Sequence, residues 1–155
     1  MNMKAIKRMA TFVLAALMVS LVATADEMKV EYNELPQKAR RFLEKHFGKI
    51  PATKEVELER NEYSVELKNG HELKFDEKGN LLEIDSPDRS TLDRSVVTDI
   101  LPENAVQYLK EKDLFGKVDE ITILRNGDYV VDIDRIANDF IIRFDVKGNV
   151  KNKAK

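Results

Sequence analysis

The chain has 155 residues, of which 28 are acidic and 26 are basic, so its formal net charge at pH 7 is −2. Such a charge balance provides no basic surface of the kind that binds nucleic acid. The sequence has no cysteine, which excludes a disulfide framework, and its two histidines are not spaced as a zinc-binding pair on a helix. We therefore expect no nucleic acid partner, no cofactor and no metal.

Residues 1–25 have the three parts of a secretory signal peptide. Three basic residues precede an apolar run from Met9 to Val22, and Ala23-Thr24-Ala25 provides a cleavage site of small residues. The run is too short to span a membrane comfortably. We expect cleavage after Ala25, export to the periplasm, and a mature chain of net charge −5 that has no membrane span.

The rest of the chain repeats one pattern. Leu35-Pro36 opens a helical run that ends at Phe47-Gly48, and Leu101-Pro102 opens a second run, 66 residues later, that ends at Phe115-Gly116. In the first run, apolar residues recur at helical spacing along one stripe. We expect Asn33 and Asp99 to cap the two helices and residues 86–95 to be a polar connector.

Segments of alternating polarity follow each helical run, and this period predicts antiparallel strands with one buried face. Pairing Val65 with Leu73 requires a three-residue loop with Gly70 in the left-handed conformation. In the same way, Ile123 should lie opposite Tyr129, with Gly127 in the loop between them. We expect about four strands after each helix.

The repeats close on Phe75–Asn80 and Phe144–Asn149, where the spacing is 69 residues. A duplication with a net insertion of three residues explains both spacings. We place the insertion between Asp134 and Ile141, with Ile133 opposite Ile142, Val131 opposite Phe144, and Asp132 opposite Arg143. The first repeat is then residues 26–88 and the second is residues 89–155.

This combination of motifs resembles the PepSY-like, β-lactamase-inhibitor-like family of exported bacterial proteins, typical of Bacteroidetes. The matching segments are Leu35-Pro36, Tyr63–Val65, Phe75–Asn80, Leu101-Pro102, Tyr129–Val131 and Phe144–Asn149. The resemblance implies an α+β fold in which a helix packs on a roughly four-stranded antiparallel sheet, twice, as in the β-lactamase inhibitor protein. It does not transfer inhibition to this chain, because a fold does not define a function.

The sequence contains few residues that could act in catalysis. Both His46 and His71 fall at positions that fit a structural role, and no phosphate-binding loop is present. Acidic residues near Asp132 could supply oxygen ligands for calcium, but we interpret them, like Glu55, Glu57 and Glu59, as a solvated sheet face. We therefore expect no enzyme activity.

The expected function is that of a non-enzymatic binding module for another exported protein or peptide. Alternatives are a small-ligand binder that uses the outer sheet face and a peptidase-inhibitor-like protein; the oligomeric state stays open. The candidate binding residues belong to the inserted hairpin and to the outer face of the second repeat, where apolar side chains replace charged ones. They are Leu124, Val130, Arg135, Ile136, Phe140 and Ile141.

Overall fold

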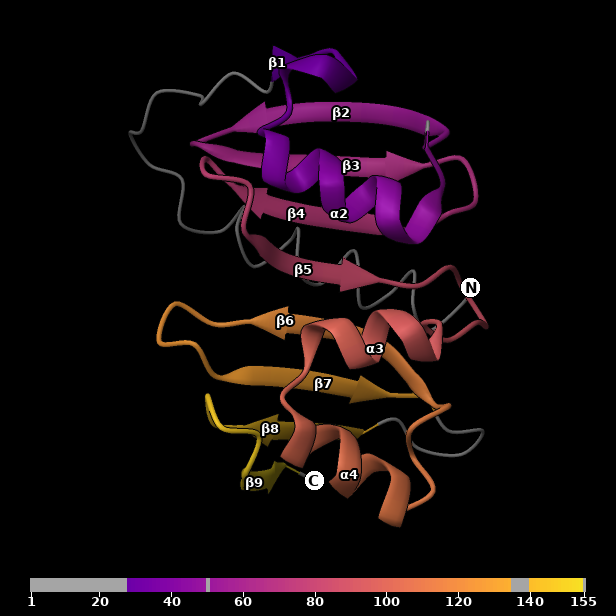
Figure 1. Ribbon diagram of the computed structural model, residues 1–155, viewed down its shortest axis with the longest axis vertical. Coiled ribbons are helices and arrows are strands. Elements are labelled where there is room, and N and C mark those ends of the chain that lie inside the picture. The colour runs from indigo at the N-terminus through magenta and orange to yellow at the C-terminus, as the bar shows by residue number, and fades with distance from the viewer. Residues whose placement is uncertain (1–27, 50, 135–139, 155) are drawn as a thin grey trace, which may run out of the picture.

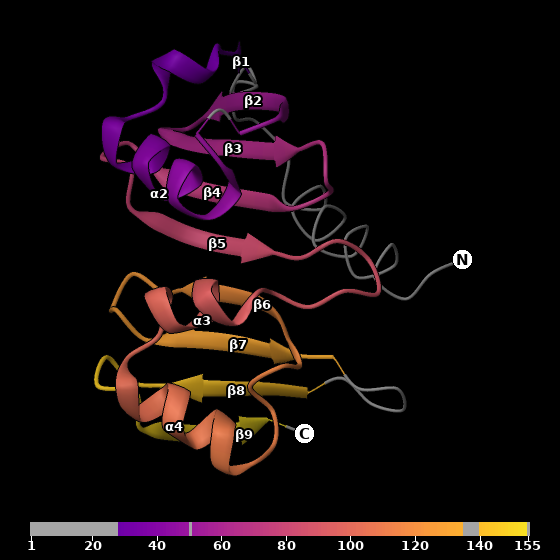
Figure 2. The ribbon, with the colours of Figure 1, turned by 45° about the vertical axis from the view of Figure 1, so that its right-hand side comes forward.

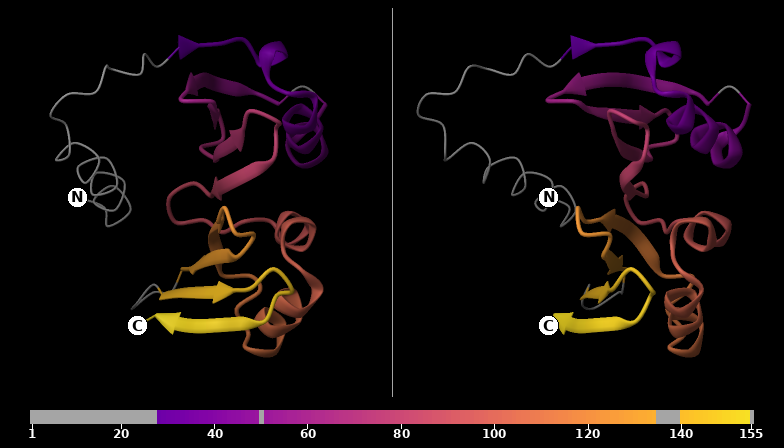
Figure 3. Two further views of the ribbon diagram at one scale, coloured as in Figure 1. Left: turned by 90° about the vertical axis from the view of Figure 1, so that its left-hand side faces the viewer. Right: turned by 60° about the vertical axis from the view of Figure 1, so that its left-hand side comes forward.

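The computed structural model describes residues 28–49, 51–134 and 140–154. The expected signal peptide and the loop residues Arg135 and Ile136 lie outside these ranges. In the described chain, one antiparallel sheet contains nine strands in chain order, and the helices cover one of its faces (Figures 1 and 3). The strands are β1 (Met28–Lys29), β2 (Thr53–Glu59), β3 (Glu62–Leu67), β4 (Glu72–Asp76), β5 (Leu81–Asp85), β6 (Val118–Ile123), β7 (Tyr129–Ile133), β8 (Phe140–Phe144) and β9 (Val150–Ala154).

The two repeats are joined through their sheets. The last strand of the first repeat, β5, pairs with the first strand of the second, β6, and Ile84 lies opposite Ile121. Both isoleucines are fully buried. The α+β fold with two repeats is therefore as expected, and the strands run from β1 to β9 without interruption (Figure 2).

The first helix, α2 (Gln37–Phe47), begins later than expected. Pro36 is its N-cap, and the short 3-10 turn η1 (Tyr32–Glu34) contains Asn33, so the prediction of Asn33 as the cap is wrong. Proline suits the boundary because its fixed φ fits the start of a helix and it has no N–H to satisfy. Gly48 ends the helix with a positive φ of 96°, as expected.

The second repeat has two helices instead of one. α3 (Arg94–Ile100) starts inside the expected connector, and α4 (Glu103–Glu111) follows it, with Pro102 as the N-cap. The prediction of Asp99 as a cap is wrong because Asp99 belongs to α3. α3 forms because Val96 and Val97 are buried against the core. α4 ends before Gly116, and Asp113 near its end has a positive φ of 54°.

The hairpin registers agree with the sequence in two cases and differ in one. Val65 pairs with Leu73 and Ile123 with Tyr129, while Gly70 and Gly127 have positive φ. In the inserted hairpin, however, Ile133 pairs with Phe140. The full set of observed pairs between β7 and β8 is Tyr129 with Phe144, Val130 with Arg143, Val131 with Ile142, Asp132 with Ile141, and Ile133 with Phe140.

The error in the inserted hairpin is a shift of two residues, which keeps every side chain on its expected face. The shift adds a pair at the tip, where Phe140 packs against the core. Asp132 consequently lies opposite Ile141, and Arg143, its expected partner, lies opposite Val130.

α2 and α4 are each fixed to the sheet by the turn that closes their repeat. Gly79 and Gly148 lie in the two Phe-Asp-x-x-Gly-Asn turns and have φ values of +79° and +83°. A Cβ on Gly79 would come 2.8 Å from the backbone nitrogen of Ala39, and a Cβ on Gly148 would come 2.6 Å from that of Ala105. Only glycine fits where turn and helix backbone approach this closely.

In both turns, the aspartate organises the loop. The Asp76 carboxylate accepts hydrogen bonds from the backbone N–H groups of Lys78 and Asn80, at 2.9 and 2.8 Å. Asp145 accepts the equivalent bonds from Lys147 and Asn149, at 2.8 and 2.9 Å. Such bonds from one carboxylate to nearby N–H groups are typical of Asx turns. The repeated motif therefore holds the glycine beneath the helix.

We predict that Leu43→Ala and Leu109→Ala each lower the free energy of unfolding by about 2–5 kcal/mol, because a buried leucine leaves a cavity when truncated. Both side chains are fully buried on the sheet side of α2 and α4. Urea denaturation measures the loss. Arg41→Ala, at an exposed position of α2, is the control, and losses no larger than those of the control would contradict the observed helix phase.

We also predict that Gly79→Ala and Gly148→Ala each cost more stability than Gly48→Ala. All three glycines have positive φ, but a Cβ on Gly48 would meet nothing within 4 Å. Left-handed backbone costs an alanine about 1–2 kcal/mol, and overpacking adds about 1–3 kcal/mol at the two turn positions. Equal shifts of the urea midpoint for the three variants would show that the close approach contributes nothing.

Candidate functional site

The two faces of the sheet differ in what covers them. α2, α3 and α4 all lie on one face, and among the described residues no helix lies on the other (Figure 3). We call the second face the strand face. It extends over both repeats because β5 and β6 are paired. The described helices are also too short or too polar to cross a membrane.

A continuous line of acidic residues crosses the strand face. It runs perpendicular to the strands from β2 to β7, with one carboxylate on each strand, and it passes from the first repeat to the second at β5 and β6. We call it the carboxylate line. The directly opposed pairs are Glu55 with Glu66, Glu66 with Glu72, Glu72 with Asp85, Asp85 with Glu120, and Glu120 with Asp132.

Like charges directly opposite each other destabilise a sheet, so this arrangement has an energetic cost. Cations offset part of this cost at the first repeat. Lys29 forms an ion pair with Glu55, and Lys54 Nζ lies 2.8 Å from Glu66 Oε1. In the neighbouring row, Lys74 Nζ lies 3.0 Å from Glu83 Oε1. The lysines of these three ion pairs lie on β1, β2 and β4.

The pKa of Glu120 indicates the electrostatic potential where the line enters the second repeat. Burial and the negative charges of Glu83, Asp85 and Asp132 raise the pKa of Glu120 to about 7, although the Thr122 hydroxyl donates a hydrogen bond of 3.1 Å to it. A carboxyl that retains its proton near neutral pH lies in a strongly negative, partly desolvated environment. The centre of the strand face therefore favours cations.

The sequence-predicted binding residues lie beside this line. Val130 and Ile141 are half-buried on the strand face, and Leu124 is 37% exposed at the end of β6. Successive registers place Leu124, Val130 and Ile141 along a diagonal across β6, β7 and β8. We call these three residues the apolar diagonal. It meets the carboxylate line at Ile141, which lies opposite Asp132.

The inserted hairpin is less separate from the fold than expected. Phe140 lies opposite Ile133 and packs against the core as a half-buried residue. Arg135 and Ile136 lie outside the described residues. The structure thus brings Leu124, Val130 and Ile141 together and places Phe140 with the core. Whether any of them contacts a partner stays a prediction.

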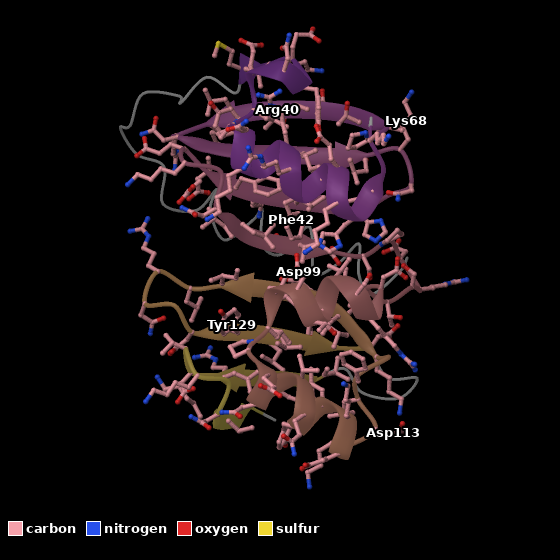
Figure 4. All side chains as sticks on the ribbon, viewed as in Figure 1. Arg40, Phe42, Lys68, Asp99, Asp113 and Tyr129 are labelled. Atoms are coloured by element: carbon pink, nitrogen blue, oxygen red, sulfur yellow. The ribbon has the colours of Figure 1, made fainter. Side chains whose placement is uncertain are left out.

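The two histidines lie near the junction of the repeats. His46 Nε2 is 2.9 Å from Asp99 Oδ2, so the last turn of α2 contacts α3 (Figure 4). Hydrogen bonds from Lys45 and His46 hold the pKa of Asp99 below its usual value. The His71 ring packs 4.9 Å from Phe47, and burial lowers the pKa of His71. These contacts give both histidines structural roles.

Metal coordination requires several ligands that converge on one point. In the described ranges, no group of three histidine or carboxylate side chains is arranged in this way. The acidic residues are instead spread along the line. The sequence shows each acidic residue of the line, but not that the residues are aligned. Their alignment depends on five strand registers. Sequence analysis therefore did not predict the carboxylate line.

We predict that Glu120→Gln stabilises the protein at alkaline pH by about 1–3 kcal/mol and changes little at about pH 4. The folded-state pKa of about 7 lies above the ordinary value of 4.5. Between these values the folded state binds more protons, so stability falls as pH rises, and the penalty is complete above the folded pKa. Glutamine removes this penalty.

Urea denaturation at about pH 4 and about pH 8 measures the effect across the window in which the two states bind different numbers of protons. Glu77→Gln, at an exposed position of the turn after β4, is the matched control. A pH-independent change for Glu120→Gln, or an equal gain in the control, would contradict the electrostatic origin of the penalty.

A known protein family matches both repeats of the chain. The family model described as "Putative beta-lactamase-inhibitor-like, PepSY-like" matches residues 22–83 and 90–152. A solved structure from Bacteroides vulgatus ATCC 8482, described as a "putative periplasmic protein of unknown function", is 23% identical with a TM-score of 0.68, over 84% of this chain and 100% of that one. No curated protein matches the chain.

A second solved structure, from Bacteroides thetaiotaomicron, is described as a "putative calcium-regulated periplasmic protein". It is 26% identical with a TM-score of 0.70, over 86% of this chain and 100% of that one. The resemblance of the repeated motifs is thereby confirmed, because the family model covers both repeats. The chain belongs to the PepSY-like, β-lactamase-inhibitor-like family.

Proposed function

We propose that this protein is a non-enzymatic binding module of the periplasm, and that its strand face binds a cationic segment of another exported protein or peptide. The observation that carries the proposal is the carboxylate line, which crosses six adjacent strands, β2 to β7, and both repeats. Complementary charge attracts and orients a partner on such a surface.

The dimensions of the line favour a polypeptide over a small ligand. Adjacent strands lie about 4.8 Å apart, so the carboxylates from β2 to β7 extend over about 24 Å. Small-molecule sites are concave and concentrate a few polar groups around one ligand. A line of charge along the strand face instead suits an elongated partner with several cations.

The energetic cost of the opposed carboxylates favours a role in binding over a role in stabilising the fold. Ionised Glu120 lowers the stability of the fold because it is buried beside other negative charges, and a neutral residue would not. Groups with strongly shifted pKa values are enriched at functional sites. A catalytic role has less support, because the described residues around Glu120 are carboxylates, Thr122 and apolar side chains, without a nucleophile and base in contact.

The periplasmic location rests on two observations. The N-terminal residues have the pattern of a secretory signal peptide. The solved structures from Bacteroides that share the fold are described as periplasmic proteins.

Calcium is a second candidate ligand, because the Bacteroides thetaiotaomicron relative is described as calcium-regulated. Carboxylates are preferred calcium ligands. The described side chains do not converge into a coordination sphere, however, so calcium binding would require them to rearrange. We therefore favour the cationic polypeptide.

Binding of a labelled oligolysine peptide, measured by fluorescence anisotropy, tests the proposal. At about pH 8, where Glu120 is mostly ionised, the triple variant Asp85→Asn, Glu120→Gln and Asp132→Asn removes three consecutive charges of the line. We expect it to weaken binding at least about tenfold, because several charge contacts are lost together. The matched control removes three exposed acids outside the strand face, Glu77→Gln, Glu103→Gln and Glu111→Gln.

The control has the same net charge as the triple variant, so it separates a defined site from general attraction. Its affinity should stay within about twofold of the unmodified protein. Equal losses in both variants, or no binding by the unmodified protein, would overturn the proposal. Displacement of the peptide by calcium, but not by magnesium at equal ionic strength, would favour the second candidate.

A further inference from the structure

We propose that the contact between the two repeats depends on pH: the repeats are held together in mildly acidic solution, and their junction loosens in mildly alkaline solution. The junction consists of the paired residues of β5 and β6 in the sheet and of the contact between α2 and α3 on the helix side. Titratable groups from both repeats meet in each of these two parts. The proposal concerns the fold itself and is independent of the ligand proposed above.

The sheet part of the junction is short. β5 and β6 share three residue pairs, whereas neighbouring strands within β2–β5 and within β6–β9 share four to six. Beyond these pairs, the Ser86 amide donates a hydrogen bond of 2.9 Å to the Asp119 carbonyl. Local opening costs least where the fewest interactions are lost. The junction is therefore the part of the sheet at which the two repeats separate most easily.

On the strand face, Glu120 lies between two other carboxylates. Asp85 of β5 and Asp132 of β7 are its direct neighbours in the register, and Glu83 of β5 lies opposite Thr122 in the next row. Burial and, after it, these negative charges raise the pKa of Glu120 to about 7. Separation of β5 from β6 exposes Glu120 to water and removes the two charges of β5. The open junction therefore releases a proton that the closed junction retains.

The sign of the effect follows from this difference in proton binding. Between the ordinary pKa of 4.5 and the folded value of about 7, the closed junction binds more protons than the open one, so a rise in pH favours opening. Above the folded pKa the effect is complete. Lys74 on β4 lies 3.0 Å from Glu83, but Glu83 still raises the pKa of Glu120.

A second titratable contact joins the repeats on the helix side. His46 Nε2, in the last turn of α2, lies 2.9 Å from Asp99 Oδ2 of α3, and the His46 side chain is only 4% exposed. Hydrogen bonds from Lys45 and His46 hold the pKa of Asp99 below its usual value, so Asp99 is ionised in mildly acidic solution. Histidine gains a positive charge in such solution. Protonation therefore strengthens this contact too, in the same direction as at Glu120.

His71, the other histidine, has a different environment. Its ring packs 4.9 Å from Phe47 of its own repeat. Burial lowers the pKa of His71, although the charges of Asp93 and Asp85 act in the opposite direction. Because its main contact lies within the first repeat, we expect the titration of His71 to affect that repeat more than the junction. His71 is therefore a suitable control.

Hydrogen exchange of the native protein at about pH 5.5 and about pH 8, corrected for the intrinsic exchange rates, tests the proposal. The probe is the Ser86 amide, because Ser86 is fully buried and its hydrogen bond crosses the junction. The references are the buried residues Leu67 and Leu114, whose amides bond within their own repeats, to His71 and Leu109. We expect the protection of Ser86 to fall at least about tenfold relative to both references as the pH rises.

Variants assign this response to its two groups. Glu120→Gln should reduce the relative fall at Ser86 to about threefold or less, and Glu120→Gln combined with His46→Gln should abolish it, because neither part of the junction then titrates. His71→Gln, the control, should leave the response within about twofold of the unmodified protein. The reference amides show whether each variant is folded.

Three results would overturn the proposal. An equal pH dependence at Ser86 and at both references would mean that the whole fold responds and not the junction. Protection of Ser86 that is independent of pH would exclude the effect altogether. A response that persists in the double variant, or disappears in His71→Gln, would show that the wrong groups were assigned. The proposed function is unaffected by any of these results, because no ligand is present in the experiment.

Discussion

The close approach of a turn glycine to the first turn of a helix is the constraint on which the rest of this structure depends. In each repeat the glycine has positive φ and leaves no room for a Cβ against the backbone nitrogen of Ala39 or Ala105. The turn follows β4 in the first repeat and β8 in the second, so this contact fixes the helix relative to the sheet. Because both repeats use it, α2 and α4 lie on the same face of the joined sheet (Figure 3). Among the described residues, the opposite face is formed by strands, and the carboxylate line lies on it.

The pairing of strands between the two repeats places opposed carboxylates on the strand face. Pairing of β5 with β6 buries Ile84 against Ile121 on the helix side, and the same register places Asp85 opposite Glu120 on the strand side. One register thus produces the continuous core and also places the charge of Asp85 beside Glu120, where burial and, after it, neighbouring negative charges raise the pKa of Glu120. The burial of isoleucines stabilises the junction by an amount that can offset such repulsion, since each fully buried side chain contributes about 1.5–3 kcal/mol. Carboxylates that repel each other can therefore face each other where the two repeats join.

Much of this architecture could be predicted from the sequence, because local chemistry determines it. The duplicated turns, the positive φ at Gly70 and Gly127, and the pairing of Val65 with Leu73 follow from alternation and loop length. α3 was missed because its buried residues, Val96 and Val97, are β-branched, and the segment was too short to show a helical period. The register of β7 and β8 was misplaced by two residues because alternation fixes the face of a residue but not its partner. The carboxylate line could not be predicted either, because alternation does not show that β5 pairs with β6 or in which register.

Equivalent strands of the two repeats differ at one position of the register. Ile84 in β5 lies opposite Leu73, and the residue in the same position of β9, opposite Ile142, is Lys153. The strand that continues into a second repeat has an apolar residue at this position, whereas the edge strand has a charged one. Lysine on an edge strand is a common means of preventing further strand pairing. At the other end, β1 pairs with β2 through Met28 and Lys29 and occupies part of that edge. The two repeats contribute unequally to the strand face: charge comes from the first repeat and the junction, and apolar surface comes from the second.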